Sequence, residues 1–263
     1  MASRITAGID IGSTASKACI FMDDRMVSSY IGPSTVNPTK TARLVYEKAL
    51  SEAGIDENEV SYIVGTGYGR ARVDFANDNI SEISCHAKGA HYLLPSIRTI
   101  IDIGGQDTKA ISIDKSGIIR EFVMNDKCAA GTGRFLDFMA RSMGLEVKDM
   151  ARLHFEEGSP STISSMCSVF AESEVINLIN EEVPLPCIIK GLHKSVANKI
   201  STMARRVGSE KDIVITGGVA KNMGVLETLE NIFESKFVSF PENIDPQIIG
   251  ALGAAVIGFE KES

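Results

Sequence analysis

The feature that most constrains this chain is a glycine-rich turn that occurs twice, 92 positions apart. GIDIGSTASKA and IDIGGQDTKA are the two copies, and superposing them places Asp10 on Asp102 and Lys17 on Lys109. Each copy reads as a short apolar strand, an aspartate, a tight turn and a second strand. Because successive glycines let backbone N–H groups point at a phosphate from close range, the repeat predicts two similar half-molecules that face each other across a nucleotide-binding cleft.

The two turns carry the side chains that a phosphate chain and its cation need. The carboxylates of Asp10 and Asp102 would repel a bare phosphate, so we expect a magnesium ion, which keeps several waters and takes only one or two carboxylates. Lys17 and Lys109 either neutralise phosphate charge or simply end their strands. The expected nucleotide contacts in the two turns are Gly12, Ser13, Thr14, Lys17, Gly104, Gly105 and Gln106.

An ordinary pair of β-hairpins is the alternative to a nucleotide site. The agreement of both copies over ten residues argues against it. Neither copy fits G-x-x-x-x-G-K-[ST], which excludes a P-loop ATPase. The run GTGYGR at residues 65–70 lacks the last glycine of G-x-G-x-x-G, and we interpret it as a turn between domain elements.

Length, charge and cysteine usage narrow the class of protein. A chain of 263 residues with 44% hydrophobic content fits one large domain or two small domains with a common cleft. The net charge of −7 and the lack of a long basic run argue against nonspecific nucleic-acid binding. Without an apolar N-terminal signal region or a run of 18 apolar residues, we expect a cytoplasmic protein that does not span a membrane. Five cysteines, an odd number, argue against a disulfide framework.

The pattern of apolar runs predicts an α/β protein with two units of the same plan. Each unit begins with strands and continues with helices, which is typical of a two-domain α/β layout. Strands are expected at 5–11, 17–21, 26–30, 62–64, 99–103, 109–113, 118–123 and 213–216. Helices are expected at 40–53, 81–91, 131–143, 170–179, 188–207, 222–233 and 246–259. The expected domains are residues 1–95 with 246–263, and residues 96–245.

Small residues dominate the last expected helix: Gly250, Ala251, Gly253, Ala254 and Ala255. Glycine has no Cβ, so such a surface permits close approach of another backbone. We expect this helix to pack tightly and to cross between the two domains.

Two further glycine-containing motifs lie in the last third of the sequence. ITGGVAKN spans residues 215–222, and IIGALGAA spans residues 248–255. Together with the two turns they resemble the superfamily of acetate kinases, sugar kinases, Hsp70 chaperones and actin. The resemblance implies two ribonuclease-H-like domains flanking an ATP-binding cleft, with Asp10 and Asp102 as catalytic acids that act through metal-bound water. It also implies an adenosine-binding turn, and the expected nucleotide contacts in and near it are Gly217, Gly218, Val219, Asn222 and Gln247.

A tighter resemblance is carried by NDKCAAGTGRFLD (residues 125–137) and SSMCSVFAESEV (residues 164–175). These motifs are similar to those of the activator ATPases of 2-hydroxyacyl-CoA dehydratases, within the BadF/BadG/BcrA/BcrD family, whose related subunits serve benzoyl-CoA reductases. The resemblance implies a homodimer that binds ATP/ADP and Mg²⁺ and shares one 4Fe-4S cluster, with Cys128 and Cys167 as ligands. It also implies ferredoxin or flavodoxin as the electron source. The implied acceptor is a partner iron–sulfur dehydratase or reductase, which includes double-cubane proteins.

Cysteine chemistry is consistent with a shared cluster. A 4Fe-4S cluster takes four thiolates, and two chains related by a two-fold axis supply four from one residue pair. Cys128 and Cys167 each lie at the mouth of an expected helix, whose N-terminus favours negative charge. Two buried structural cysteines, or a zinc site bridging two chains, are the alternatives. Cys19, Cys85 and Cys187 are expected to be core or near-surface residues.

Energetics suggest why an electron carrier would use ATP. A one-electron shift of about 200 mV corresponds to about 4.6 kcal/mol, whereas an exposed helix N-terminus contributes only about 0.3–1 kcal/mol. We therefore expect closure of the cleft around a nucleotide to change the surroundings of the cluster. Gln106 and Asp107 are candidates for orienting the attacking water. Glu172 either acts through magnesium or water, or is a solvated helix charge.

Two other functions compete with this one. A sugar or acetate kinase of the same superfamily would need a second substrate pocket, for which 263 residues leave little room. A nucleotide sensor or assembly factor would bind ATP but turn it over negligibly.

Overall fold

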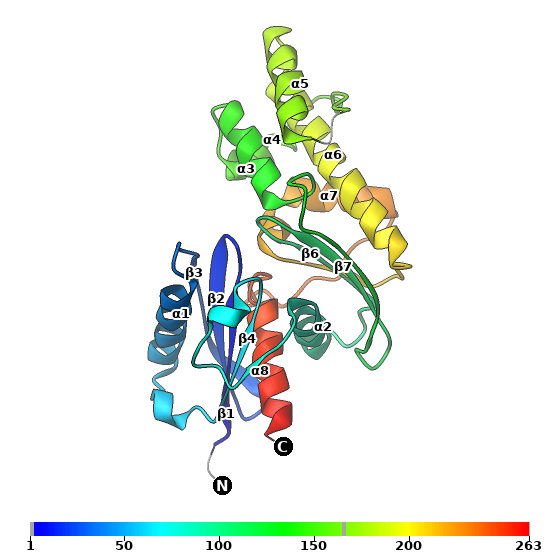
Figure 1. The fold of residues 1–263 in the computed structure, drawn as a ribbon. Coiled ribbons are helices and arrows are strands. Elements are labelled where there is room, and N and C mark those ends of the chain that lie inside the picture. Colours follow the sequence, from blue (N-terminus) through cyan, green and yellow to red (C-terminus); the bar gives the residue numbers. More distant parts are fainter. Residues whose placement is uncertain (1–2, 165–166, 263) are drawn as a thin grey trace.

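Two β-sheets, each built around one copy of the repeated turn, form the framework of the computed structural model (Figure 1). It describes residues 3–164 and 167–262, so Ser165 and Met166 of the second cysteine motif lie outside the described residues. The first sheet has the order β3-β2-β1-β4-β5 and consists of β1 (Ile5–Ile11), β2 (Ala15–Met22), β3 (Arg25–Pro33), β4 (Tyr62–Thr66) and β5 (Asp78–Asn79). The second has the order β8-β7-β6-β9 and consists of β6 (Thr99–Ile103), β7 (Thr108–Ile113), β8 (Ile119–Asn125) and β9 (Ile213–Thr216).

Both sheets follow the same plan. The first three strands of each are antiparallel neighbours, and a later strand, β4 or β9, pairs in parallel with the first. The register places Lys17 opposite Asp10 in one sheet and Lys109 opposite Asp102 in the other. The predicted duplication is therefore confirmed in the pairing of the strands.

The parallel strands extend the duplication beyond what the sequence indicated. Thr66 of β4 and Thr216 of β9 occupy the same place, each beside the aspartate of its own sheet. Each is followed by a glycine, Gly67 or Gly217, with a φ of 85°, a conformation that glycine adopts without steric cost. The GTGYGR run is thus the first-sheet counterpart of the glycine turn after β9.

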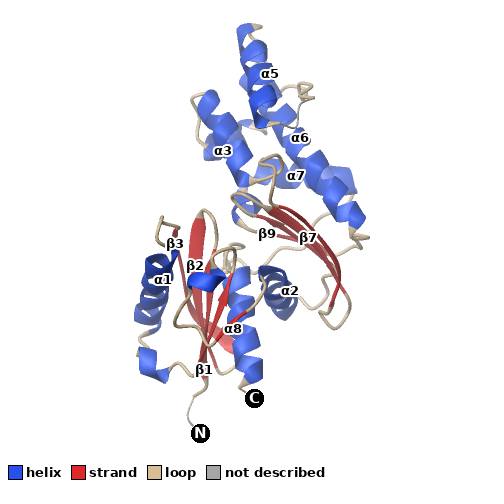
Figure 2. Cartoon of the chain, in the orientation of Figure 1, coloured by secondary structure: helices blue, strands red, loops and turns tan. Residues whose placement is uncertain are grey.

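The helices cover both sheets and fill the space between them (Figures 1 and 2). Helices α2 and α8 lie between the sheets, α1 covers the other face of the first sheet, and α3 to α7 gather beyond the second. Their bounds are α1 (Pro38–Ala53), α2 (Glu82–Leu93), α3 (Gly133–Ser142), α4 (Val147–Leu153), α5 (Ser168–Asn180), α6 (Leu185–Arg206), α7 (Met223–Phe233) and α8 (Ile249–Lys261). Three short 3-10 helices span Glu57–Glu59, Arg70–Arg72 and Gly218–Lys221.

Strand alternation explains how one strand serves two layers. Successive side chains of a strand point to opposite faces of its sheet. In β1 the isoleucines, such as Ile9, pack in the cluster that contains α1, while Thr6 on the other face donates a hydrogen bond to the carbonyl of Ala255 in α8. Asp10 shares the face of Thr6, so its carboxylate points toward the space between the sheets.

Glycines let α8 cross closely against its neighbours, as its composition predicted. A Cβ on Gly253 of α8 would lie 1.8 Å from the carbonyl oxygen of Cys85 in α2, and a Cβ on Gly89 would lie 2.2 Å from the carbonyl oxygen of Ile249. The C-terminal helix therefore packs on α2 and on β1 together. This placement supports the division into residues 1–95 with 246–263 and residues 96–245, which stays a proposal.

Several element boundaries differ from those expected. Helix α3 begins at Gly133 instead of residue 131, and α4 was not expected at all. The last helix begins at Ile249 instead of residue 246, because the carbonyl of Pro246 accepts a hydrogen bond from the amide of Gly217. Among the described helices, none combines the length and apolarity needed to cross a membrane.

Candidate functional site

A cleft of about 890 Å³ opens between the two halves and is lined by both repeated turns. The structure brings together in it most of the residues that the sequence singled out. These are Asp10, Gly12, Ser13, Thr14, Lys17, Asp102, Gly104, Gly105, Gln106, Asp107, Gly217, Gly218, Val219, Asn222 and Gln247. The two turns lie 92 positions apart in the sequence. They meet at the cleft because of how the two sheets that carry them are arranged in the fold.

Ion pairs join each aspartate to its cross-strand lysine. Lys17 Nζ lies 3.1 Å from Asp10 Oδ2, and Lys109 Nζ lies 3.0 Å from Asp102 Oδ2. Lys109 is nearly inaccessible and also lies 2.8 Å from Asp107 Oδ2. The lysines therefore do more than end their strands, since they neutralise the acids at the floor of the cleft.

Burial and neighbouring charges shift the pKa values of these groups. Burial by itself would raise the pKa of Asp102, but His86 and Lys109 outweigh it and hold that pKa well below its usual range. Burial would lower the pKa of Lys109, but Asp102 and the adjacent acids keep it above its usual value. Burial raises the pKa of Glu82, a cleft residue whose Oε2 lies 3.5 Å from Lys109 Nζ.

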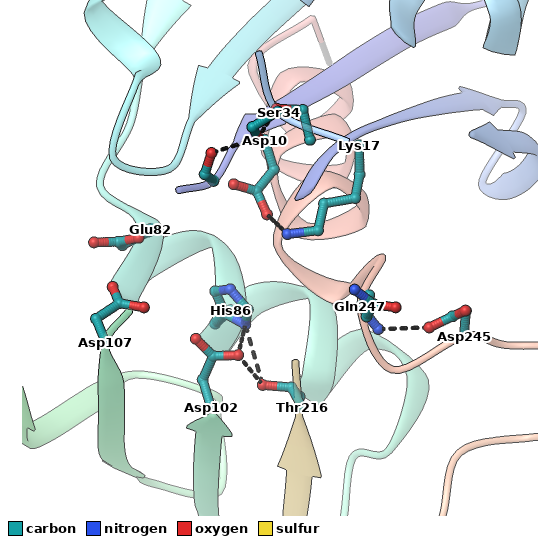
Figure 3. A network of polar contacts seen from close by, with 12 residues as sticks. Asp10, Lys17, Ser34, Glu82, His86, Asp102, Asp107, Thr216, Asp245 and Gln247 are labelled. Carbon is teal, nitrogen blue, oxygen red and sulfur yellow. Dashed lines mark hydrogen bonds and ion pairs between the residues drawn. The ribbon is translucent and has the colours of Figure 1, made fainter. Parts of the chain in front are cut away.

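His86 of α2 lies between the two aspartates (Figure 3). Its Nδ1 is 3.7 Å from Asp102 Oδ1 and 3.3 Å from the hydroxyl of Thr216, which donates to the same carboxylate oxygen at 2.9 Å. A Cβ on Gly250 would lie 3.0 Å from His86 Nε2 and 2.9 Å from Asp10 Oδ2, so both atoms face that glycine. The imidazole is thus in contact with the second copy of the turn and lies near the aspartate of the first.

Glu82 and His86 were missed at the sequence level. They are four residues apart on α2, the spacing that places two side chains on one face of a helix. Both line the cleft. That spacing was the available signal, but nothing in the sequence told which face of this helix would meet the cleft.

The charge around the turns suits a hydrated divalent cation. Four carboxylates, Asp10, Glu82, Asp102 and Asp107, line the cleft near Lys17 and Lys109, while further cations such as Arg134 and Lys221 complete its lining. Within the described residues, no group of three or more His, Cys, Asp or Glu side chains is arranged to hold a metal by itself. Magnesium fits this setting, because it takes one or two carboxylates and completes its shell with water and phosphate.

The second phosphate turn is hydrogen-bonded to the segment that carries Cys128. The amide of Gly133 donates to the carbonyl of Gly104 at 2.9 Å, and the amide of Arg134 donates to that of Gly105 at 2.8 Å. The Thr108 hydroxyl donates to the carbonyl of Gly131 at 2.6 Å. Hydrogen bonds therefore join this turn directly to the start of α3.

The five cysteines differ sharply in exposure. Cys128 and Cys167 are exposed, whereas Cys19 and Cys85 are buried and Cys187 is intermediate. Burial raises the pKa of Cys85 to about 12 and that of Cys19 further, so both remain protonated thiols. Neither Cys128 nor Cys167 is buried within the single chain, and their role as ligands stays a proposal.

Cys128 and Cys167 differ in how close they lie to the start of a helix. Cys167 is the N-cap residue of α5, as expected. Cys128 lies five residues before α3, whose N-cap is Thr132, so the expectation of a helix mouth at Cys128 is wrong. Asn125 holds that loop instead, because its side-chain amide donates to the carbonyl of Cys128 at 2.8 Å.

Glu172 does not join the other expected catalytic residues. It lies half-buried on α5 and is not among the residues that line the cleft. Helix α5 projects from the far end of the second half, away from both turns (Figure 1). This position fits a solvated helix charge, the alternative weighed from the sequence.

Comparisons with known proteins agree with this geometry. A model of the BadF/BadG/BcrA/BcrD ATPase family matches residues 7–258. The activator of lactoyl-CoA dehydratase from Anaerotignum propionicum is 46% identical over 259 residues, covering 97% of each chain. The solved activator of 2-hydroxyisocaproyl-CoA dehydratase from Clostridium difficile, with bound ADPNP, is 41% identical and has a TM-score of 0.91, covering 98% of this chain and 95% of that one.

Further solved structures define the fold. Component A of (R)-2-hydroxyglutaryl-CoA dehydratase from Acidaminococcus fermentans is 42% identical with a TM-score of 0.93, covering 98% of each chain. A ROK hexokinase from Thermus thermophilus, only 14% identical, has a TM-score of 0.57 and shows the fold alone, covering 98% of this chain and 100% of that one. The predicted two-sheet α/β fold of the actin, Hsp70 and sugar kinase type is thereby confirmed.

Proposed function

The chain belongs to the BadF/BadG/BcrA/BcrD ATPase family, and from that membership we propose that it is an ATP-dependent activator that delivers single electrons to a partner iron–sulfur enzyme. A 2-hydroxyacyl-CoA dehydratase is the proposed partner, the kind of enzyme that the names of its relatives state for those proteins. The observation that carries the proposal is the hydrogen-bonded contact between the second phosphate turn and the segment of Cys128. It joins the place where a nucleotide would react to an exposed thiol.

The cleft would hold ATP or ADP with its phosphates against the two turns. Lys17 would offset phosphate charge, whereas Lys109 offsets the acids that surround it. Asp10 and Asp102 would hold a hydrated Mg²⁺ ion. Gln106 lies in the second turn and lines the cleft, which supports it as the residue that would orient the attacking water. Asp107 shares that location, although its carboxylate also binds Lys109.

Cys128 and Cys167 are the thiols that we propose as cluster ligands. Both are exposed on one chain, and a second copy related by a two-fold axis would complete the four thiolates that a 4Fe-4S cluster takes. Such a cluster would supply one-electron transfer when bound. Zinc accepts the same four thiolates, so metal content is part of the test below.

The contacts of the second turn suggest how this chain would couple nucleotide turnover to the cysteines. A γ-phosphate against Gly104 and Gly105 would move the two carbonyls that accept from Gly133 and Arg134. Because α3 starts at Gly133, its first turn and the preceding Cys128 loop would follow. ATP binding would thereby reorient the thiol-bearing surface, and hydrolysis would reset it.

An apolar surface on α5 supports the proposed assembly. Val169 and Phe170 are 62% and 65% exposed directly after Cys167, and Ile176 and Ile179 continue along the same helix. Such a surface is typical of a protein interface. We propose a cytoplasmic homodimer that takes electrons from ferredoxin or flavodoxin. A double-cubane or benzoyl-CoA-reductase-type enzyme is the alternative acceptor.

Replacing the two exposed cysteines tests the function. Under strict exclusion of oxygen, Cys167→Ala and Cys128→Ala should lose iron, visible absorbance and partner activation, while Cys187→Ala keeps all three as the matched control. Slow ATP hydrolysis should persist in each variant, because no cysteine lines the cleft. Colourless wild-type protein that contains zinc, or an intact cluster in Cys167→Ala, would contradict the ligand assignment.

A small-molecule kinase is the second candidate function. A pocket of about 190 Å³ adjoins the first phosphate turn and is lined in part by Ser34, Thr35, Tyr68 and Gln106. A phosphoryl acceptor bound there would lie beside the expected γ-phosphate. Formation of a phosphorylated product from ATP by iron-free protein would favour this function over electron transfer.

A further inference from the structure

Two histidines are buried against each other behind the cleft. His154 follows α4 and His193 lies within α6, and their Nδ1 atoms are 2.9 Å apart. A Cβ on Gly224 would lie 2.6 Å from His154 Cγ and 2.6 Å from His193 Nδ1. The first turn of α7 therefore has room for the two rings only because residue 224 is glycine.

The pair is continued at both ends by polar groups. On the outer side, His154 Nε2 lies 3.2 Å from the Glu227 carboxylate. On the inner side, His193 Nε2 lies 3.5 Å from Nδ2 of Asn222, a residue that lines the cleft. Asn222 Oδ1 accepts from the amides of Gly224 and Val225 and caps α7. Its amide nitrogen is therefore the atom left to face His193.

These partners determine which atom donates and which accepts in the row of hydrogen bonds from Glu227 to Asn222. A carboxylate only accepts, so His154 Nε2 carries a hydrogen toward Glu227, and a neutral His154 then has a bare Nδ1. His193 must donate from Nδ1 to that atom, which leaves His193 Nε2 free to accept from the Asn222 amide. Each buried group is satisfied only in this arrangement.

Protonation of His154 would reverse the direction. Both ring nitrogens of an imidazolium donate, so His193 Nδ1 would have to accept and its hydrogen would move to Nε2. That hydrogen would then face the Asn222 amide, which is itself a donor. His193 does not take up the proton in place of His154, because burial, helped by His154, lowers the pKa of His193 to about 3.

Glu227 is the charged side chain in hydrogen-bond contact with His154. Burial opposes the charge of Glu227, but hydrogen bonds from His154 and Asn231 outweigh it and lower its pKa. Three cations of the surrounding elements have partners of their own. Arg152 pairs with Glu156, Lys190 donates to the carbonyls of Glu156 and Gly158, and Lys236 pairs with Glu230.

We propose that His154 and His193 are positioning residues for the nucleotide, which orient the Asn222 amide at the cleft and make nucleotide affinity fall when His154 is protonated. The inference rests on the proposed nucleotide function of the cleft. It adds a dependence of nucleotide affinity on pH, which arises from two residues that do not line the cleft.

The first test reads the tautomers without any nucleotide. Long-range ¹H–¹⁵N spectra of the histidine rings in the intact protein at about pH 8 should show hydrogen on Nδ1 of His193 and on Nε2 of His154. Assignment by His154→Gln and His193→Gln identifies the signals. Hydrogen on Nε2 of His193 at this pH would overturn the inference, whatever the protein binds.

The second test measures ADP affinity, since ADP is not hydrolysed. Between about pH 8 and about pH 5.5, the dissociation constant of wild-type protein should rise about fivefold more than that of His154→Gln. The cleft residues and the ADP phosphates are the same in both proteins, so the difference isolates His154. His91→Gln, which removes a histidine far from this pair, should behave as wild type.

A third variant separates positioning from mere structural support. Glu227→Gln removes the charge that favours the imidazolium, so the pH midpoint of the affinity change should move downward while affinity at about pH 8 is retained. Equal pH dependence in wild type and His154→Gln would refute the proton link. If wild-type protein bound no ADP at any pH, the nucleotide function itself would fail and this inference with it.

Discussion

Lys109 and Asp102 form a buried ion pair, with Nζ 3.0 Å from Oδ2 and both side chains almost completely shielded from solvent. Lys17 and Asp10 repeat the pair in the first sheet at 3.1 Å, but Lys17 is more exposed. The pair in the second sheet therefore depends more on its own partners, because water screens it less. Removing one partner should therefore cost more stability in the second sheet than in the first.

Lys109→Met should destabilise the fold strongly. The substitution leaves Asp102 and its neighbouring acids without their cation, and breaking a buried pair from one side costs about 3–5 kcal/mol. Urea unfolding of the nucleotide-free protein measures the change. Lys17→Met is the matched control and should cost less, since its pair is partly solvated; equal losses in the two variants would contradict the role of burial.

Acid should destabilise the protein through Asp102. Its folded-state pKa is lowered, so its contribution is present above the unfolded-state pKa of about 3.9 and is lost as the pH falls through the folded-state value. Urea midpoints measured downward from neutral pH should therefore decline less steeply in Asp102→Asn than in wild type. Asp126→Asn, at an exposed position, should leave the wild-type slope unchanged.

Alkaline conditions should act on the same pair with the opposite sign. The folded-state pKa of Lys109 is raised, so its contribution is present below the unfolded-state pKa of about 10.4 and is lost as the pH rises through the folded-state value. The alkaline limb of the stability curve should be flatter in Lys109→Met than in wild type. A parallel limb in the two proteins would show that Lys109 does not hold its charge on folding.

Thr108→Val should uncouple hydrolysis from activation. The substitution keeps the shape of the side chain but removes the 2.6 Å bond to the carbonyl of Gly131, in the loop that follows Cys128. We expect ATP hydrolysis to be retained and ATP-dependent electron delivery to fall about two- to tenfold. Thr202→Val removes a comparable hydroxyl-to-carbonyl bond at an exposed position of α6 and should change neither rate.

Gly217→Ala should abolish nucleotide binding. Its φ of 85° is strained for alanine, and its Cβ would lie 2.4 Å from the carbonyl oxygen of Ile103 and 2.8 Å from Asp102 Oδ1. Gly208→Ala shares the strain, with a φ of 65°, but meets nothing within 4 Å. Backbone strain of about 1–3 kcal/mol should appear in both variants, whereas ADP titration should detect lost binding in Gly217→Ala alone.

Much of the fold was readable from local sequence. The duplicated aspartate, glycine and lysine pattern predicted two equivalent hairpins, because strand alternation and glycine turns depend on residues close together in the chain. The same holds for the small-residue helix and for the helix that begins after Cys167. Boundaries were less accurate where a distant contact ended an element, as the bond from Gly217 to Pro246 does before α8.

The placement of the remaining site residues depended on long-range packing. His86 reaches Asp102 and Thr216 only because α2 is held between two sheets, and the start of α3 meets Gly104 only because β7 and β8 turn back beside it. Glu172 lies outside the cleft for the same kind of reason, since α5 extends away from both turns. Local patterns encode strands, turns and ligand types, whereas contacts between residues 100 or more positions apart, such as that of His86 with Thr216, arise from the pairing of strands and the crossing of helices.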